Sequence, residues 1–139
     1  MSLVQTGAAV VLDAALGVWL GSIVFFSFVG APTTFDVLGG EAGRVVNAIF
    51  PKYYAFGAGL GWVAFGAAFV AEPGGPLGGT LLTAVVLVGI ALDLYARQVL
   101  IPKMERAGDD AFAKYHKQSV ALNGVTMVAV AAALVLSHL

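Results

Sequence analysis

The chain has 139 residues, of which 60% are hydrophobic and 11% are charged, and its mean hydropathy is +0.93. Average soluble domains are about 45–50% apolar and about 25% charged, so this composition argues against a water-soluble globular domain. The net charge of −1 argues against a nucleic-acid partner. The lack of cysteine excludes disulfides, thiolate metal sites and cysteine nucleophiles.

Long apolar stretches follow one another along the chain, and each is near the length of about 20 residues that crosses a bilayer as a helix. The four stretches are Ala8–Gly30, Tyr53–Ala71, Leu77–Leu100 and Ser119–Ser137. Strands of a membrane β-barrel alternate apolar and polar residues, whereas these stretches are apolar throughout, and only helices then satisfy the backbone in lipid. The sequence predicts an all-α integral membrane four-helix bundle, a single four-span domain over residues 1–139 with antiparallel up-down topology.

The first stretch is expected to remain as a span rather than to be a cleaved signal peptide. No Lys or Arg precedes it, and its apolar run is longer than that of a signal peptide. It is expected to stop before Pro32, because proline disfavours helix in the preceding residue. In the gap that follows, apolar residues between Phe35 and Phe50 favour a short interfacial helix, and Pro51 is expected to mark the start of the second span.

The gaps after the second and third stretches differ in charge. The second gap, EPGGPLGG, predicts a tight turn, so the second and third spans are expected to be antiparallel neighbours. All seven Lys and Arg residues lie in or beside the first and third gaps: Arg44, Lys52, Arg97, Lys103, Arg106, Lys114 and Lys117. Positively charged loops face the cytoplasm. We therefore expect a bacterial inner (cytoplasmic) membrane protein with loops 1 and 3 in the cytoplasm and both termini outside.

Small residues indicate how the helices pack. Gly17 and Gly21 are spaced four apart in the first stretch, and Gly57 and Gly61 have the same spacing in the second. Such pairs let helix backbones approach closely in membranes. We expect these pairs to pack within one bundle, with a dimer interface as the alternative.

Ionisable residues within a span are costly and therefore suggest function. Asp13 lies in the first span, toward the outer side, where it is expected to be near enough to the surface to be wetted. Asp93 lies in the third span and is four residues before Arg97, a spacing at which the two side chains can pair on one face of a helix. A structural ion pair and a functional site both fit this pattern.

A candidate polar binding site lies at the start of the fourth span. His116, Ser119 and Asn123 share one helix face, and Asp93 and Arg97 approach the same side of the membrane from the third span. These five groups are suited to a lipid head group, a small polar ligand or the propionates of a porphyrin. The alternative is a network of hydrogen bonds between helices, worth about 0.6 kcal/mol per bond on average.

Binding of haem iron by His116 ranks low among the possible functions of this site. The other histidine, His138, is 22 residues away, which is roughly 33 Å along a helix at about 1.5 Å per residue. Haem or another tetrapyrrole would need His116 alone, a Met partner or a second subunit. No cofactor and no metal are therefore predicted. No catalytic residue is proposed either, since the sequence has no nucleophile elbow, phosphate-binding loop or zinc-binding histidine pair.

Several segments resemble a known family. The segments are WLGSIVFFSFVGAPTTF, IFPKYY, LD followed by IPKM, and FAKYHKQSVALN. They resemble the small four-helix proteins of the transmembrane protein 205-like family, over about Trp19 to Asn123, most strongly at Phe112, His116, Ser119 and Asn123 together. The resemblance implies a four-span membrane protein and no defined reaction, and bacterial members are mostly domains of unknown function. A distant likeness to the membrane protoporphyrinogen oxidase type conflicts with the lack of a histidine in the first span.

Three functions from different classes follow. The first is a small non-enzymatic accessory subunit that packs within a larger membrane complex and binds lipid, pigment or other subunits. Its partners would be membrane lipids and other integral membrane subunits. The second is a haem- or porphyrin-linked membrane oxidoreductase that uses His116. The third, which ranks last, is a small transporter component, because four short spans with one polar cluster near one surface make a poor pathway.

Overall fold

The computed structural model describes residues 2–106 and 109–139, apart from the side chains of Pro76 and of residues 109–113. In these residues the chain is helical almost throughout, so the all-α class is confirmed. The α-helices are α1 (Leu3–Phe25), α2 (Ala31–Leu38), α3 (Ala42–Ala71), α4 (Gly75–Tyr95), α5 (Ile101–Arg106) and α6 (Asp109–Leu136). Short π-helical segments, η1 (Phe26–Gly30) and η3 (Ala96–Leu100), and a 3₁₀ turn, η2 (Gly39–Glu41), connect some of them.

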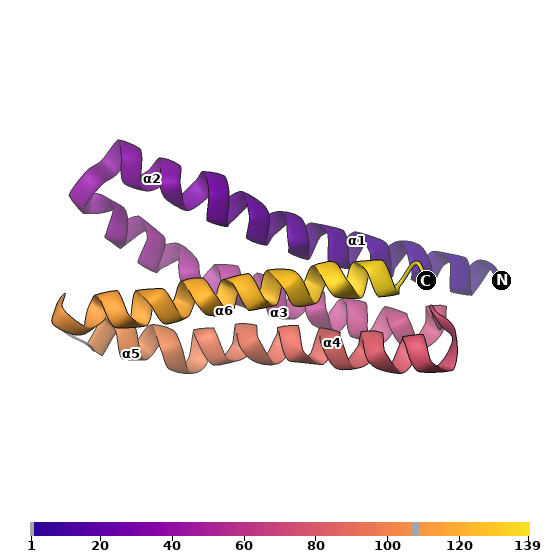
Figure 1. Ribbon diagram of the computed structural model, residues 1–139. Coiled ribbons are helices and arrows are strands. Elements are labelled where there is room, and N and C mark those ends of the chain that lie inside the picture. Colours follow the sequence, from indigo (N-terminus) through magenta and orange to yellow (C-terminus); the bar gives the residue numbers. More distant parts are fainter. Residues whose placement is uncertain (1, 107–108) are drawn as a thin grey trace.

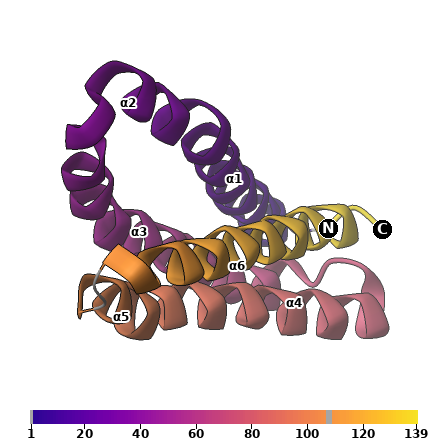
Figure 2. The same ribbon diagram turned by 60° about the vertical axis from the view of Figure 1, so that its left-hand side comes forward.

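The long helices lie side by side (Figures 1 and 2). α1 packs against α3 and α6, and α4 also packs against α3 and α6. Both termini lie at one end of the molecule, whereas α2 and α5 lie at the opposite end (Figure 1). The end with α2 and α5 carries the Lys- and Arg-bearing segments of the sequence.

Three continuous helical stretches in the described residues are long and apolar enough to cross a membrane: Leu3–Ala71, Leu77–Arg106 and Lys114–Leu136. Large apolar side chains cover their outer surfaces, including Phe69 and Val128, which are 62% and 66% exposed. This surface is suited to lipid rather than water. The first stretch doubles back on itself at η2 (Figure 1), and its division into two separate spans stays a prediction.

Residues with positive φ make the turns. Gly39, which ends α2, has φ 54° and ψ −119°, a conformation that only glycine adopts readily. The turn between α3 and α4 contains Glu72 at φ 48° and Gly74 at φ 73°. The turn is short, so α3 and α4 are neighbours, as the EPGGPLGG segment predicts.

Two prolines follow π-helical segments instead of ending helices. The predicted stop before Pro32 is wrong, because the helix continues from α1 through η1 into α2. Proline lacks an N–H and its ring crowds the carbonyl four residues earlier. The wider π turn relieves that crowding, and the N–H of Ala31 bonds to the Phe26 carbonyl five residues back. Pro102 has the same arrangement, with the N–H of Ile101 bonded to Ala96.

Pro51 also lies inside a helix. The sequence predicts that it marks the start of the second span, and that boundary stays a prediction, but the helix α3 itself begins nine residues earlier, at Ala42. Packing of the preceding turns explains the difference, because Ala42 and Val46 are buried. Transmembrane helices tolerate proline where neighbouring groups satisfy the freed backbone.

The apolar core forms where the four long helices meet. One stripe of α1 is fully buried, and it comprises Leu12, Leu16, Trp19 and Ile23. It packs against small residues of α3, such as Ala64, and against Leu82, Val86 and Ile90 of α4. The small residues of α3 leave room for Trp19, the largest side chain that is fully buried. The fit of large α1 side chains against small α3 residues therefore determines how the two helices align.

Candidate functional site

A buried tryptophan binds the only acidic side chain that is buried in the described residues. Trp19 Nε1 donates a hydrogen bond of 3.1 Å to Asp93 Oδ2, which joins α1 to α4. Trp19 is 1% exposed and Asp93 is 3% exposed. A buried indole N–H and a buried carboxyl group each need a partner. The Trp19–Asp93 pair therefore satisfies two polar groups that would otherwise be costly inside the helices.

Three glycines, which we term the glycine slot, make room for this pair: Gly57 and Gly61 on α3, and Gly89 on α4. A Cβ atom at Gly57 would lie 2.8 Å from Trp19 Nε1, and one at Gly89 would lie 2.8 Å from the edge of the indole ring. Both distances are shorter than van der Waals contact allows. Gly57 and Gly61 thus pack within the chain, in the manner expected from their spacing.

Gly17 and Gly21 lie elsewhere. They are on the exposed face of α1, opposite the buried stripe, and a Cβ atom at either would meet nothing within 4 Å. The expectation that they pack within the bundle is therefore corrected. The physical reason is the bulk of Trp19 and its apolar neighbours, which gain more from burial in the core than the glycines do.

Asp93 and Arg97 do not pair. No ion pair joins them in the described part of the chain, although their spacing suggests one. Arg97 instead donates from Nε to the Pro51 carbonyl at 3.1 Å. Asp93 lies buried in the core and binds Trp19, whereas Arg97 is exposed and reaches α3. Neither residue lines the pocket described next.

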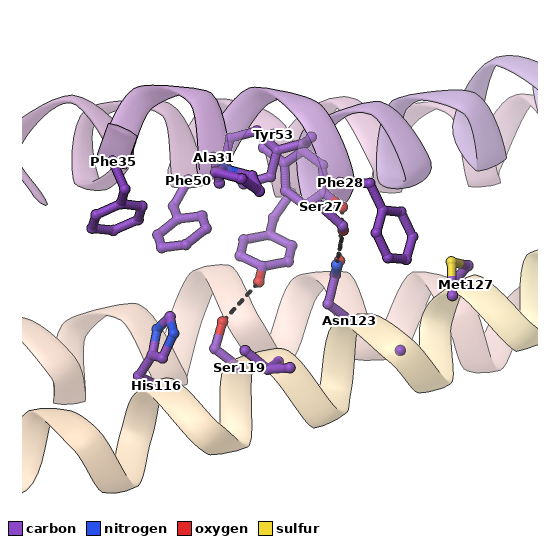
Figure 3. Close-up of a pocket in the computed structure, with 15 residues that line it drawn as sticks. Ser27, Phe28, Ala31, Phe35, Phe50, Tyr53, His116, Ser119, Asn123 and Met127 are labelled. Carbon is purple, nitrogen blue, oxygen red and sulfur yellow. Dashed lines mark hydrogen bonds between the residues drawn. The ribbon is translucent and has the colours of Figure 1, made fainter. Parts of the chain in front are cut away.

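A pocket of about 400 Å³ opens between η1, α2, the first half of α3, and α6 (Figure 3). It contains three residues of the predicted polar site, His116, Ser119 and Asn123. We term it the aromatic pocket, and its described lining comprises Phe26, Ser27, Phe28, Ala31, Pro32, Phe35, Phe50, Tyr53, Tyr54, His116, Ser119, Val120, Asn123, Gly124 and Met127. None of these side chains is acidic, and none is Lys or Arg.

A row of hydrogen bonds crosses the pocket between helices. Tyr53 donates from its hydroxyl group to Asn123 Oδ1 at 2.7 Å, and Asn123 Nδ2 donates to Ser27 Oγ at 2.6 Å. One turn earlier on α6, the hydroxyl groups of Tyr54 and Ser119 lie 3.3 Å apart (Figure 3). Part of the predicted alternative, a network between helices, is therefore present at the same place as a pocket.

The two serines of this row behave unlike other hydroxyl residues of the long helices. Ser22, Thr83 and Thr126 each donate to a backbone carbonyl three or four residues earlier in their own helix. Ser27 and Ser119 bond instead to side chains of other helices. A hydroxyl group that turns back on its own helix is satisfied locally, so these two serines mark the face where helices meet around the pocket.

Aromatic rings form most of the remaining wall. The rings of Phe26 and Tyr53 lie 4.7 Å apart between centroids, and those of Tyr53 and Tyr54 meet edge to face at 5.0 Å. Phe50 stacks near Tyr54 at 5.9 Å. The side chains of Phe35 and His116 lie at one end of the pocket, and that of Met127 lies at the other (Figure 3). The pocket is thus an apolar chamber with one polar edge.

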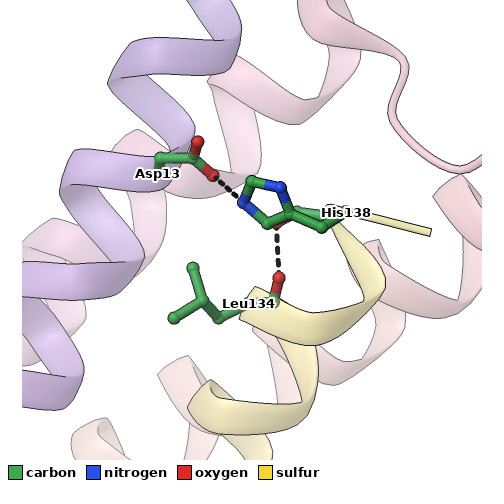
Figure 4. Close-up of polar contacts among 4 residues, drawn as sticks. Asp13, Leu134 and His138 are labelled. Carbon is green, nitrogen blue, oxygen red and sulfur yellow. Dashed lines mark hydrogen bonds and ion pairs between the residues drawn. The ribbon is translucent and has the colours of Figure 1, made fainter.

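Asp13 and His138 meet at the opposite end of the molecule. His138 Nε2 lies 3.0 Å from Asp13 Oδ1, which joins the end of α6 to α1 (Figure 4). The side chains are 63% and 45% exposed, respectively. The interpretation of Asp13 as a partly wetted residue agrees with this exposure. His138, near the carboxyl end of the chain, thus binds across to α1.

Sequence reasoning did not identify several residues of the pocket. Tyr53 and Tyr54 of the pocket, and Trp19 of the buried pair, are not among the site residues that the sequence predicts. One signal was available, because a buried Asp93 requires a donor from another helix, and Trp19 is a strong donor near the same depth. No sequence signal reveals that Ser27 reaches Asn123, 96 residues away.

Comparison with known proteins gives the family. The family model described as "Domain of unknown function (DUF4149)" matches residues 14–113, which is more than half of the chain. The chain belongs to the DUF4149 family. An uncharacterized protein of Aquifex aeolicus (strain VF5) is 34% identical over 114 residues, covering 79% of this chain and 81% of that protein. No solved structure matches the DUF4149 chain.

The segment that matches the family contains only part of the site. It includes Trp19, Asp93 and the aromatic residues of η1, α2 and α3. His116, Ser119 and Asn123 lie beyond residue 113, as does His138. The α6 wall of the aromatic pocket is therefore argued from the geometry of this DUF4149 chain alone.

Proposed function

We propose that this DUF4149 chain is a small non-enzymatic subunit of the inner membrane that holds a membrane-soluble molecule in the aromatic pocket. The observation that carries the proposal is the pocket itself, which has a polar edge without Asp, Glu, Lys or Arg in an aromatic wall. Binding sites for small molecules are commonly apolar chambers with a few well-placed polar groups. The relationship to transmembrane protein 205-like proteins belongs to the same proposal.

The proposed membrane arrangement has four spans in an antiparallel bundle. The cytoplasmic side is the end that contains α2 and α5, because the Lys and Arg residues gather there. We expect a thiol-reactive, membrane-impermeant reagent to label a Ser2→Cys variant from outside intact spheroplasts. A Lys103→Cys variant should be labelled only after lysis. The opposite labelling pattern would contradict the orientation.

Exposed apolar features support the accessory role. Trp62, Phe65 and Phe69 form an edge-to-face ladder along α3, with Trp62 51% and Phe69 62% exposed. Aromatic residues are enriched at protein interfaces. We propose that other membrane subunits pack against such faces while the pocket holds its ligand.

Purification in a mild detergent from the native host tests this function. We expect partner subunits and one lipophilic molecule to co-elute with the wild-type chain. A Gly124→Leu variant should lose the small molecule, because Gly124 lines the pocket and a Cβ there meets nothing within 4 Å. Gly66→Leu is the matched control, since Gly66 is exposed on α3 with equally open space. A lone wild-type chain with no enriched molecule would contradict the proposal.

A tetrapyrrole is the second candidate occupant, favoured by the position of His116 in the pocket lining. Met127 also lines the pocket, but it is 11 residues further along α6, roughly 16 Å at about 1.5 Å per residue, so the two cannot bind one iron. His138 lies at the opposite end of the molecule. A Soret band in the same preparation that disappears in His116→Ala would establish this candidate in place of the first.

A further inference from the structure

We propose that the aromatic pocket binds a quinone-type molecule, meaning a flat neutral ring with two carbonyl oxygens and an apolar tail. This inference rests on the proposed function, because it names the chemical class of the ligand for that pocket. Three properties of the pocket support it: the charge of the lining, the spacing of its hydrogen-bond donors, and the shape of its aromatic walls.

The described lining contains no Asp, Glu, Lys or Arg side chain, and its one histidine, His116, lies at the end of the pocket near Phe35, away from Asn123 (Figure 3). A phosphate or ammonium group at the polar edge formed by Ser27, Ser119 and Asn123 would meet only neutral side chains there, and an unpaired charge in an apolar chamber is very costly. Arg97, the cationic residue bound to the Pro51 carbonyl, is exposed and outside the lining. We therefore expect the part of the ligand that lies at this polar edge to be neutral.

The polar edge offers donors beyond its internal hydrogen bonds. The amide of Asn123 has two N–H groups, and Ser27 accepts one of them. The Tyr54–Ser119 pair has two O–H protons, and the bond between them uses one. Ser119 and Asn123 are four residues apart, so their Cβ atoms lie about 6 Å from each other, which places the Asn123 amide and the Tyr54–Ser119 hydroxyl pair one helical turn apart. The two carbonyl oxygens of a para-quinone, at opposite corners of a six-membered ring, have a similar spacing.

The aromatic walls suit a flat ring. Phe26, Phe50 and Tyr53 surround the polar edge, and an electron-poor quinone ring stacks favourably on the negative faces of such rings. Phe28 and Val120, on η1 and α6, are 66% and 60% exposed and line the same pocket. An apolar tail can leave between these two residues and enter the surrounding lipid.

The test uses the full chain in lipid nanodiscs. A short-tailed benzoquinone is titrated by equilibrium dialysis, with empty nanodiscs subtracted for partition into lipid, and diacylglycerol is titrated in parallel. Diacylglycerol is also neutral and bears two ester carbonyls, but it has no ring. We expect saturable binding of one quinone per chain, with diacylglycerol a poor competitor.

Variants locate the binding. Gly124→Leu should abolish saturable binding by filling the chamber. Asn123→Leu should weaken binding about tenfold, the effect of losing one well-placed hydrogen bond. Thr126→Val is the control on the same helix, because the Thr126 hydroxyl group bonds to its own helix at Leu122 and lies outside the lining. Helix content and thermal unfolding confirm that each variant is folded, and Ser119→Ala replaces Asn123→Leu if the latter fails to fold.

The outcomes separate the two proposals. Saturable binding of diacylglycerol that is lost in Gly124→Leu, with no saturable quinone binding, would overturn the quinone inference and leave the binding function intact. Quinone binding that is unchanged in both Gly124→Leu and Asn123→Leu would overturn the assignment of this site. No saturable binding of either molecule to the wild-type chain would overturn the inference and count against the proposed function.

Discussion

Replacing Gly57 by alanine is expected to destabilise the folded chain by about 3 kcal/mol, the upper part of the range for overpacking a filled interior. The new Cβ would lie 2.8 Å from Trp19 Nε1 and closer still to Asp93 Oδ2. Neither group has space to move, because both are almost fully buried among α1, α3 and α4. The substitution therefore separates α3 from the Trp19–Asp93 pair or breaks the hydrogen bond.

Gly66→Ala is the matched control for Gly57→Ala. It lies on the same helix, nine residues further along, and its Cβ would meet nothing within 4 Å. Alanine favours helix over glycine by up to about 1 kcal/mol, so this variant should be as stable as the wild type or slightly more stable. Reversible unfolding in mixed micelles with increasing dodecyl sulfate measures both variants. Equal stability of the two would contradict the tight packing described for the glycine slot.

Replacing Trp19 by phenylalanine is expected to have the second large effect, about 2–3 kcal/mol. Asp93 then loses the only hydrogen-bond donor that the described residues offer it, and an unsatisfied buried polar group costs about 1–3 kcal/mol. The smaller ring also leaves a void beside Gly61 and Gly89. Trp62→Phe is the control, because Trp62 is 51% exposed on the outer face of α3 and should change stability by less than about 0.5 kcal/mol.

A double-mutant cycle separates the hydrogen bond from the packing. Asp93→Leu replaces the carboxyl group with an apolar group of similar size, so adding it to Trp19→Phe removes both partners of the bond. The double variant should be more stable than the sum of the two single losses predicts, by at least about 1 kcal/mol. Simple additivity would show that the Trp19–Asp93 hydrogen bond contributes nothing to stability.

The core and the aromatic pocket are linked through α1. Trp19 is seven residues, about two turns, before Phe26, where η1 begins and the pocket wall starts. The Trp19–Asp93 pair holds this part of α1 against α4, and the Ser27–Asn123 bond then joins η1 to α6. Variants of the glycine slot are therefore expected to disturb the pocket as well as global stability.

Much of the fold followed from local sequence properties. The composition and the long apolar stretches predicted an all-α chain with helices able to cross a membrane, since a helix is the form in which an apolar segment satisfies its own backbone. The turn at Glu72–Gly74 was predicted because proline and glycine determine local geometry. The shared face of His116, Ser119 and Asn123 was predicted because helical periodicity is a property of one segment.

Only the tertiary structure decided which side chains meet across helices. Asp93 binds Trp19 and not Arg97, and Gly57 packs inside while Gly17 does not. These outcomes depend on the rotation of each helix about its axis, and the π turns before Pro32 and Pro102 change that rotation. Periodicity fixes which residues share a face, but the fit of bulky and small side chains between helices selects the face that turns inward.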